Sequence, residues 1–356
     1  MISRRTLLKS AIAVPGFWLL PSRAEVGNDP GSTLVVVFQR GAVDGLSMLI
    51  PYTEAAYYDR RPAIAIPPPG RDGNAQSLRL NDQFALHPAL QPFHALYEQG
   101  KLVPMPACGS PDSSRSHFNA QDTMESGVAG DRSVRDGWMN RALAQLGAGS
   151  FAAVAMTTTL PRSLRGDRQV LNFPDLDQYD IGYADAYGNI QRDEAAASTL
   201  ARLYAGDDLG AHSFSAIQKL RDRKYRSTSV SYPDGDFSHQ LSQLAQLIKS
   251  GLGVRLAFVE IEGWDTHANQ GDSVGQLAGN LYRLAYGIDA FLKDLGEFRK
   301  STAILTMSEF GRTVSQNGNR GTDHGHGTTF FAIGDAVAGG RIGGEFPGLD
   351  EESLYQ

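Results

Sequence analysis

The sequence predicts an α/β domain built on a largely parallel central sheet with helices on both faces. Short apolar runs rich in β-branched residues recur along the chain, and stretches with helical spacing of apolar residues separate many of them. Strands that alternate with longer helices are typical of a parallel sheet covered by helices. The composition is that of an ordinary globular protein, with 41% hydrophobic and 20% charged residues.

The apolar runs and the helical patterns place the elements along the chain. Strands are expected at residues 33–38, 102–107, 152–156, 254–261, 302–307 and 329–333. Helices are expected at residues 88–99, 137–146, 195–204, 214–223, 237–249 and 274–298. The run at 33–38 is continuous and β-branched, which indicates a buried central strand. The region 157–236 is less regular and rich in Gly, Asp, Ser and Tyr, so we expect an insertion or cap there, which could shape substrate access or be peripheral packing.

The first 24 residues have the features of a twin-arginine export signal. Arg4 and Arg5 are followed by leucines and Lys9, and then by an apolar stretch at residues 11–20. Spanning a bilayer takes about 20 apolar residues, so this stretch is too short to be a permanent membrane anchor. Cleavage after Ala24 would leave a single mature domain, residues 25–356, in the periplasm or outside the cell. The twin-arginine translocase and signal peptidase would be its partners during export.

Charge and cysteine content exclude two further features. A formal net charge of −6 and a sequence pI near 5.8 give no basic surface of the kind that nucleic-acid binding needs. Cys108 is the only cysteine, so an intramolecular disulfide is excluded. Stability must therefore come from the hydrophobic core, with help from a metal ion if one is bound.

Acidic residues and histidines gather at the ends of the predicted strands. Asp265 and His267 follow the strand at 254–261, and Glu309 follows the strand at 302–307. Active sites on parallel sheets lie beyond the carboxyl ends of the strands. Imidazole and carboxylate together are ligands of zinc, manganese or iron, and oxygen-rich sets suit magnesium or calcium.

A second group, Asp323, His324 and His326, comes immediately before the last predicted strand. Taken singly, Asp-x-His and His-Gly-His are also turn sequences whose histidines donate to backbone carbonyls. Their occurrence at successive strand ends favours a divalent metal site. Asp44 follows the first strand and is either a further metal ligand or part of an Asp-Gly turn.

A segment rich in hydroxyl groups, residues 113–122, enters a predicted helix after the strand at 102–107. Free backbone N–H groups at a helix start favour an anion and an activated nucleophile. Ser116 or Ser114 is therefore a candidate nucleophile, and Arg115 is a candidate clamp for an anionic group. A serine at this position also serves as a plain N-cap.

The order of these residues resembles that of the alkaline-phosphatase-like metalloenzyme superfamily, which includes phosphatases, sulfatases and cofactor-independent phosphoglycerate mutases. More closely, the whole mature chain resembles the twin-arginine-exported bacterial family of domain of unknown function 1501. The segments that carry this resemblance are Arg40-Gly41-Ala42-Val43-Asp44-Gly45-Leu46, Ser116-His117-Phe118-Asn119-Ala120-Gln121-Asp122, Gly263-Trp264-Asp265-Thr266-His267, Ser308-Glu309-Phe310-Gly311-Arg312-Thr313 and Asp323-His324-Gly325. The resemblance implies an alkaline-phosphatase-like core.

The resemblance also implies roles for the metal ligands. Asp265 and His267 would hold one metal, with His326 or His324 as the third ligand. Glu309 resembles the acidic ligand of a second metal. The candidate metal-ligand residues are, together, Asp44, Asp265, His267, Glu309, Asp323, His324 and His326.

The chain departs from the superfamily pattern at three places. Phe310 stands where the superfamily usually has a histidine and cannot coordinate, so a second metal depends on Asp323 or His324. The nucleophile position falls near Ser116 and His117, which makes both of them, with Arg115, candidate catalytic residues. Family members are also expected to extend to a further strand and helix, so this chain would be shortened at that edge.

The resemblance implies metal-dependent hydrolysis of phosphate or sulfate esters. Ser116 would attack, Arg115 would hold the anionic oxygens, and a zinc, manganese, calcium or magnesium ion would neutralise charge. One alternative is an exported binding or assembly protein that keeps the fold and one metal without chemistry, which Phe310 supports. Another is an enzyme that acts on a cell-envelope or polysaccharide component through a single metal.

Overall fold

A computed structural model describes residues 31–70, 76–131, 133–146, 152–176 and 229–354, and two short strands between the last two ranges, β8 (Gly182–Ala184) and β9 (Ile190–Arg192). The predicted signal segment and the helices expected at 195–204 and 214–223 lie outside the described residues. Among the helices that the structure describes, none has the length and apolar composition needed to cross a membrane.

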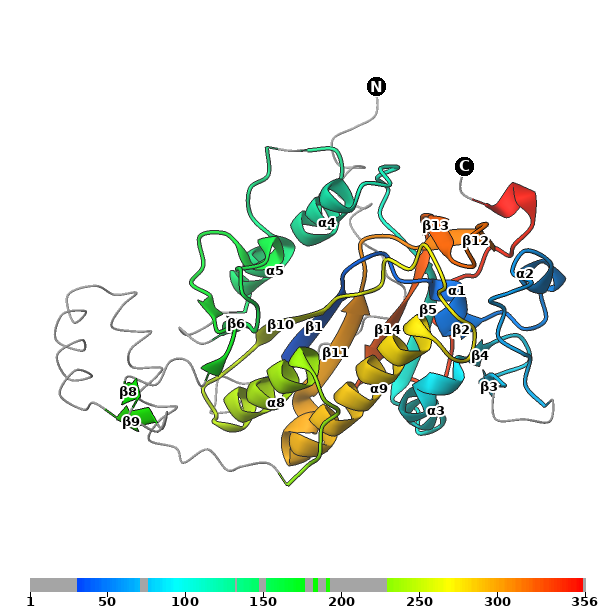
Figure 1. The fold of residues 1–356 in the computed structure, drawn as a ribbon. Coiled ribbons are helices and arrows are strands. Elements are labelled where there is room, and N and C mark those ends of the chain that lie inside the picture. The colour runs from blue at the N-terminus through cyan, green and yellow to red at the C-terminus, as the bar shows by residue number, and fades with distance from the viewer. Residues whose placement is uncertain are drawn as a thin grey trace.

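A seven-stranded sheet forms the centre of the molecule (Figure 1). In spatial order its strands are β5 (Leu102–Cys108), β14 (Thr328–Ile333), β11 (Thr302–Met307), β1 (Thr33–Gln39), β10 (Leu256–Ile261), β6 (Ala153–Ala155) and β7 (Leu171–Asn172). The six predicted strands all belong to this sheet, with bounds within two residues of the prediction. The seventh, β7, lies inside the range 157–236 and extends the sheet at its edge.

The strand directions determine which loops meet. β1 is parallel to both β10 and β11, and β6 and β7 continue the parallel arrangement on the far side of β10. Only β14 runs the other way, antiparallel to β11 and to β5. The start of β14 therefore lies at the same edge of the sheet as the carboxyl ends of the other strands. Residues that precede β14 thus meet residues that follow β1, β10 and β11.

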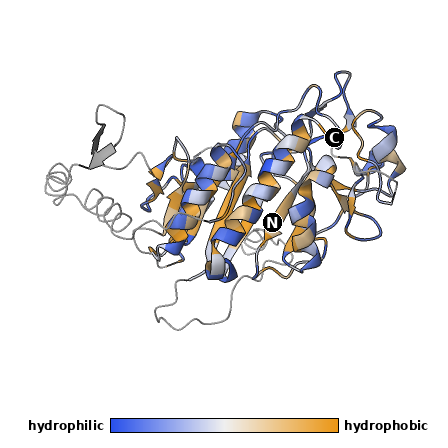
Figure 2. Cartoon of the chain, turned by 60° about the horizontal axis from the view of Figure 1, so that its bottom comes forward, coloured by the Kyte–Doolittle hydropathy of each residue, from blue (hydrophilic) through white to orange (hydrophobic). Residues whose placement is uncertain are grey.

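Helices cover both faces of the sheet, which confirms the predicted fold class. Alternate side chains of a strand point to opposite faces. Val35 and Val37 of β1 join a buried cluster with helices α3 (Gln91–Glu98), α8 (Asp236–Lys249) and α9 (Gln276–Asp294). Val36 and Phe38 join another cluster with α5 (Trp138–Leu143). Figure 2 shows the strands largely hydrophobic and the helices hydrophilic on their outer sides.

The longest helix, α9, illustrates how the sequence produces this packing. Leu277, Leu281, Leu284, Ile288 and Phe291 are spaced three or four residues apart, so they lie on one side of the helix, and all are fully buried. Each such side chain contributes about 1.5–3 kcal/mol when it leaves water. Beyond the end of α9, Gly296 adopts a φ of 56°, which a glycine tolerates at little cost.

Shorter elements complete the part of the chain that the structure describes. The helices among them are α1 (Gly45–Met48), α2 (Ala55–Asp59) and α4 (His117–Ser126). The strands are β2 (Leu49–Ile50), β3 (Leu78–Arg79), β4 (Ala85–Leu86), and the hairpin of β12 (Arg312–Gln316) with β13 (Thr322–His324). Short 3₁₀ turns occur at η2 (Pro88–Leu90), η3 (Arg162–Leu164), η5 (Gly296–Ser301) and η6 (Glu351–Ser353).

Candidate metal centre

Four side chains from different parts of the chain converge at the carboxyl edge of the sheet. They are His117, the first residue of α4; Asp265 and His267, in the loop after β10; and His324, the last residue of β13. We call them the histidine–aspartate cluster. Ligand atoms of His117, Asp265 and His324 all lie within 4.8 Å of one another, and no other group of this kind occurs among the residues that the structure describes.

The spacing of the donor atoms fits a single metal ion. The Nε2 atom of His324 lies 3.0 Å from Nε2 of His117 and 3.0 Å from Nε2 of His267. Asp265 Oδ1 lies 3.1 Å from Nε2 of His267 and 3.4 Å from Nε2 of His324, and Asp265 Oδ2 lies 3.6 Å from Nε2 of His117. Ligands about 2.0–2.1 Å from a tetrahedral zinc ion are separated by about 3.3–3.4 Å. The donor atoms of His117, Asp265 and His324 therefore lie close enough together to share one metal ion, and His267 lies beside His324 and Asp265 without belonging to that group of three.

The outer nitrogen of each histidine ring has an oxygen partner. The partner of each Nδ1 atom is a carboxylate or carbonyl oxygen, which can only accept a hydrogen bond. We therefore assign the ring proton to Nδ1 in all three histidines. The Nε2 atom of each neutral ring then presents a lone pair to the centre of the cluster. Metal-binding histidines in proteins are typically oriented in this way. The three pairs are His117 with Glu309 Oε1 at 2.8 Å, His324 with the Arg115 carbonyl at 2.8 Å, and His267 with Asp323 Oδ1 at 3.2 Å.

Glu309 supports the cluster from behind and does not enter it. Its side chain is fully buried. Besides its contact with His117, Oε1 accepts hydrogen bonds from the Gly41 backbone N–H at 2.9 Å and from Gln121 at 3.0 Å, and Oε2 accepts one from Ser308 at 3.0 Å. Burial would raise the pKa of Glu309, but these hydrogen bonds, led by that of His117, hold it below its usual value. Glu309 is therefore an ionised carboxylate that holds the His117 ring, and the structure places it behind the cluster and not among its donor atoms.

The protonation equilibria of two rings differ because their surroundings differ. The hydrogen bond to Glu309 raises the pKa of His117. Burial lowers the pKa of His324, more than the hydrogen bond to the Arg115 carbonyl raises it. His324 is therefore held in the neutral form that metal ions bind.

Arg312 fixes the orientation of Asp265. Its side chain is fully buried, and Nη2 donates to Asp265 Oδ1 at 2.5 Å. Burial would raise the pKa of Asp265, but the hydrogen bond and the charge of Arg312 hold it below its usual value. Asp265 is thus ionised, with Oδ2 directed toward His117. The other bonds of the guanidinium go to the carbonyls of Gly41 at 2.7 Å, Ala42 at 2.6 Å, Trp264 at 3.1 Å and Thr322 at 3.0 Å.

Phe310 supports the rings through packing. It is 4% exposed, and its ring centroid lies 5.0 Å from that of His117 and 5.0 Å from that of His324. Phe310 therefore forms an apolar wall behind two of the donor rings.

Asp44 lies outside the cluster, so the structure does not bring it together with the other candidate metal ligands. Its carboxylate is 1% exposed and binds the fully buried Arg61 through both oxygens, with Nη1–Oδ2 and Nη2–Oδ1 distances of 2.6 and 3.0 Å. Ser47 and Gln270 also donate to Oδ2, each at 2.7 Å. Oδ2 thus accepts three hydrogen bonds and Oδ1 accepts one, all within the buried interior, so Asp44 forms a buried structural ion pair.

Two further candidate ligands lie at the margin. Asp323 is 61% exposed at its side chain and accepts a hydrogen bond from Asn317 at 2.9 Å as well as from His267. Asp323 thus orients the His267 ring through its Nδ1 atom. His326 lines a neighbouring cavity, and its ring lies against Gly109, where a β-carbon would be only 3.2 Å away. Of the two histidines considered as the third ligand, His324 is the one in the cluster.

The segment 113–116 contacts the cluster through its backbone, because the Arg115 carbonyl binds the His324 ring and Ser116 directly precedes His117. Ser116 is the N-cap residue of α4, but its hydroxyl makes no capping hydrogen bond, and its side chain is exposed. The Ser116 N–H donates to the Ser114 hydroxyl at 3.2 Å. Arg115 is exposed, and its carbonyl holds the His324 ring. The structure thus places Ser116 next to a donor residue without showing a contact between its hydroxyl and the cluster.

The sequence matches a family model over residues 32–354, and the family is described as a protein of unknown function, DUF1501. The chain belongs to this family. No curated protein shows significant sequence similarity to it.

Several solved structures share parts of the DUF1501 chain's fold at very low identity. They include the C-terminal periplasmic domain of EcEptC from Escherichia coli in complex with Zn (9% identity, TM-score 0.39, covering 87% of this chain and 75% of that one). They also include the PsFucS1 sulfatase from Pseudoalteromonas sp. (13%, 0.37, 88% and 64%) and the alkaline phosphatase of the Antarctic bacterium TAB5 (10%, 0.33, 88% and 94%). The chain spans less than two thirds of the length of the sulfatase. At these identities and TM-scores, the function must be argued from the chain's own residues.

Proposed function

We propose that this DUF1501 protein binds one divalent metal ion in the histidine–aspartate cluster and hydrolyses phosphate or sulfate esters there. The observation that supports the proposal is the convergence of ligand atoms of His117, Asp265 and His324 within 4.8 Å of one another. The Nδ1 atoms of both of these histidines, and of the adjacent His267, are already held by oxygens. An imidazole-rich donor set favours zinc, whereas calcium and magnesium prefer shells made of oxygen.

The chain's own residues could bind and attack an anionic ester. A metal ion in the cluster would supply positive charge to the ester oxygens. The Arg115 guanidinium has no hydrogen bond or ion pair with any described residue, so it is free to hold an anionic group. Ser116 carries an uncommitted hydroxyl beside His117 and is the candidate nucleophile. Overall, one water molecule is consumed, and an alcohol and inorganic phosphate or sulfate are released.

A second candidate function is a binding or assembly protein with a structural metal. Four protein donors fill a tetrahedral shell, which is typical of structural zinc sites, whereas catalytic sites use three and leave one position open. His267 decides between them, because its side chain is 44% exposed and only the exposed Asp323 holds its outer nitrogen. If His267 coordinates, the shell is closed; if it does not, the fourth position is available to substrate.

The test measures metal content and ester turnover of the mature protein purified without chelator. We expect about one zinc per chain, with metal-dependent turnover of 4-nitrophenyl phosphate or sulfate. His324→Ala should lose both, and His94→Ala is the matched control, because His94 bonds the Arg79 carbonyl away from the cluster. Wild-type protein without metal would overturn the proposal.

The His267→Ala and Ser116→Ala variants separate the two candidate functions. Retained metal with turnover unchanged or raised in His267→Ala supports the open, catalytic site. Retained metal in the wild type with no turnover of any ester supports the binding protein. Turnover that falls at least 100-fold in Ser116→Ala, with metal retained, supports Ser116 as the nucleophile, and unchanged turnover contradicts that role.

We also propose that the protein is exported through the twin-arginine translocase and then processed by signal peptidase. The support is the Arg4-Arg5 pair and a donor set contributed by residues far apart in sequence, which requires folding before metal can bind. Replacing Arg4 and Arg5 by Lys should leave folded, metal-bearing precursor in the cytoplasm. Unfolded, metal-free precursor there would contradict this route.

A further inference from the structure

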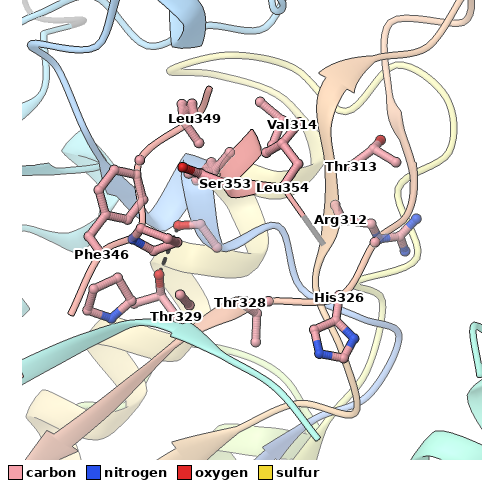
Figure 3. A pocket seen from close by; sticks show the side chains of 18 of the residues that line it. Arg312, Thr313, Val314, His326, Thr328, Thr329, Phe346, Leu349, Ser353 and Leu354 are labelled. Atoms are coloured by element: carbon pink, nitrogen blue, oxygen red, sulfur yellow. Dashed lines mark hydrogen bonds between the residues drawn. The ribbon is translucent and has the colours of Figure 1, made fainter. Parts of the chain in front are cut away.

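A cavity of about 630 Å³ lies beside the histidine–aspartate cluster. Its walls come from α1, the end of β5, β12, the segment that leads into β14, and the C-terminal segment 346–354. Figure 3 shows Val314, Leu349 and Leu354 on the upper side of the cavity, and Thr328 and Thr329 on its lower side. The volume falls within the range of about 300–1,000 Å³ that is typical of small-molecule sites.

The walls of the cavity combine apolar side chains with positively charged ones. The apolar part of the lining includes Leu46, Leu49, Val314, Phe346, Leu349 and Leu354. The charged part contains arginines, and no aspartate or glutamate lines the cavity, although the protein as a whole has a net charge of −6. A site that is positive within an acidic protein selects for anions.

The arginines of the lining differ in what they can offer a ligand. The guanidinium of Arg312 is consumed by Asp265 and four carbonyls. Arg60 has only a 3.8 Å contact with Glu351, whose side chain is 90% exposed. The Arg115 side chain has no hydrogen bond or ion pair with any residue that the structure describes. Arg115 is therefore the cation best able to bind an incoming anion.

The cavity and the cluster share a wall. The Arg115 carbonyl accepts the hydrogen bond from His324, while the Arg115 side chain lines the cavity. Gly325 and His326, which follow His324 in the segment between β13 and β14, also line the cavity. An anionic group held by Arg115 would thus lie at the border between the two, with apolar surface extending away from it.

We infer that this cavity binds the organic part of a phosphate or sulfate monoester whose alcohol is apolar, such as an alkyl or aryl group. The anionic group is held at Arg115, and the apolar body lies against Val314, Leu349 and Leu354. As a statement about substrate class, this inference rests on the proposed function. As a statement about binding, it is measured without turnover, so the two can fail separately.

The experiment is isothermal titration calorimetry of the mature protein with decyl phosphate, kept below its critical micelle concentration. Inorganic phosphate and decanol are the comparison ligands, because each carries only half of the proposed chemistry. We expect decyl phosphate to bind at least tenfold more tightly than either. Arg115→Gln should weaken its binding at least tenfold, and Val314→Asp, which adds a negative charge to the apolar wall, should weaken it at least as much.

Two controls make the outcome decisive. Arg168→Gln removes another exposed arginine, which does not line the cavity, and it should leave binding unchanged. His324→Ala disrupts the cluster and should retain binding within about threefold, because the cavity supplies the affinity. Binding that survives both Arg115→Gln and Val314→Asp, or that disappears in His324→Ala alone, would overturn the inference. Metal-free or inactive protein that still binds decyl phosphate would overturn the proposed function and leave the cavity assignment standing.

Discussion

Asp44 follows β1 and Asp265 follows β10, two parallel strands of the same sheet, but the two carboxylates differ in burial and in their bonding partners. Asp44 is 1% exposed and receives hydrogen bonds at both oxygens from a fully buried arginine. Asp265 is 48% exposed at its side chain, and its one arginine bond, from Arg312, is to Oδ1. Both carboxylates are ionised and close to a guanidinium. Only Asp265 keeps an oxygen directed at histidines, so the bonds that the carboxylate already makes, and not its place at a strand end, distinguish the structural ion pair from the candidate metal ligand.

The largest expected effect tests the structural side of this comparison. Asp44→Asn leaves the Arg61 guanidinium buried without a counter-charge, which typically costs about 3–5 kcal/mol. Urea unfolding at pH 7 should show this loss, while the folded variant keeps the metal content of the wild type. Asp59→Asn, an exposed carboxylate on α2, is the matched control and should change stability by less than about 0.5 kcal/mol. Loss of metal from folded Asp44→Asn would show that Asp44 serves the cluster after all.

The same variant has a defined pH dependence. Burial opposes ionisation of Asp44, but the charge and hydrogen bonds of Arg61 outweigh it and hold the pKa below its usual value. A depressed carboxyl pKa contributes stability above the unfolded value of about 3.9 and loses it as the pH falls through the folded value. The stability difference between wild type and Asp44→Asn should stay constant from pH 7 to about pH 4.5 and shrink below about pH 4. A difference that shrinks above pH 5 would contradict this account.

An intermediate effect is expected for Glu309→Gln, which tests the carboxylate behind His117. The amide still accepts a hydrogen bond from the His117 ring but removes the charge that polarises it. Replacing an orienting partner of this kind typically weakens metal affinity about 10–100-fold. Competition with a zinc chelator measures the change. A complete loss of metal, as expected for His324→Ala, would instead identify Glu309 as a direct ligand.

The smallest effect is expected for Asp323→Asn, which is the exposed counterpart of the Glu309 substitution. Both carboxylates bind the Nδ1 atom of a cluster histidine, but the side chain of Asp323 is 61% exposed and that of Glu309 is fully buried. Exposed pairs contribute about 0–1 kcal/mol, so metal affinity should change by less than about fivefold. A change above tenfold in the same chelator competition would place Asp323 in the ligand shell.

The sheet could be predicted from the sequence because its strands are continuous apolar runs between turns. All six expected strands occur, whereas β7 (Leu171–Asn172), with two half-buried residues, leaves no such pattern. The reversed direction of β14 has no local signal either, because strand direction is set by pairing with β11 and β5. The reversed direction of β14 explains why His324, which precedes β14, meets Asp265, which follows β10.

The candidate site was predictable as a set of residues and less so as a set of roles. Asp265, His267 and His324 were expected as ligands because each lies at a strand end. His117 was expected near the nucleophile, yet its ring joins the cluster, because the first turn of α4 points it at Glu309. Sequence position gives no information on which atoms face each other, so it could not show that His117 lies among the donor atoms and that Glu309 lies behind them.

The main supporting residue missed by sequence reasoning was Arg312. It lies in the segment 308–313, directly after β11, but a charged residue after a strand usually faces solvent. Its burial arises from four carbonyls contributed by loops far apart in sequence, the earliest at Gly41 and the latest at Thr322. Arg61 escaped notice for the same reason, as its partner Asp44 comes from another loop. An arginine next to glycine-rich strand ends is the weak signal that could have suggested Arg312.

The order of the donor segments along the chain bears on when the proposed metal could bind. His117, Asp265 and His267 are synthesised before His324, the last residue of β13, which precedes β14. The donor set is therefore incomplete in a nascent chain until β1, β10 and β11 have been synthesised. Under the proposed function, the full cluster is available to a metal ion only after that point.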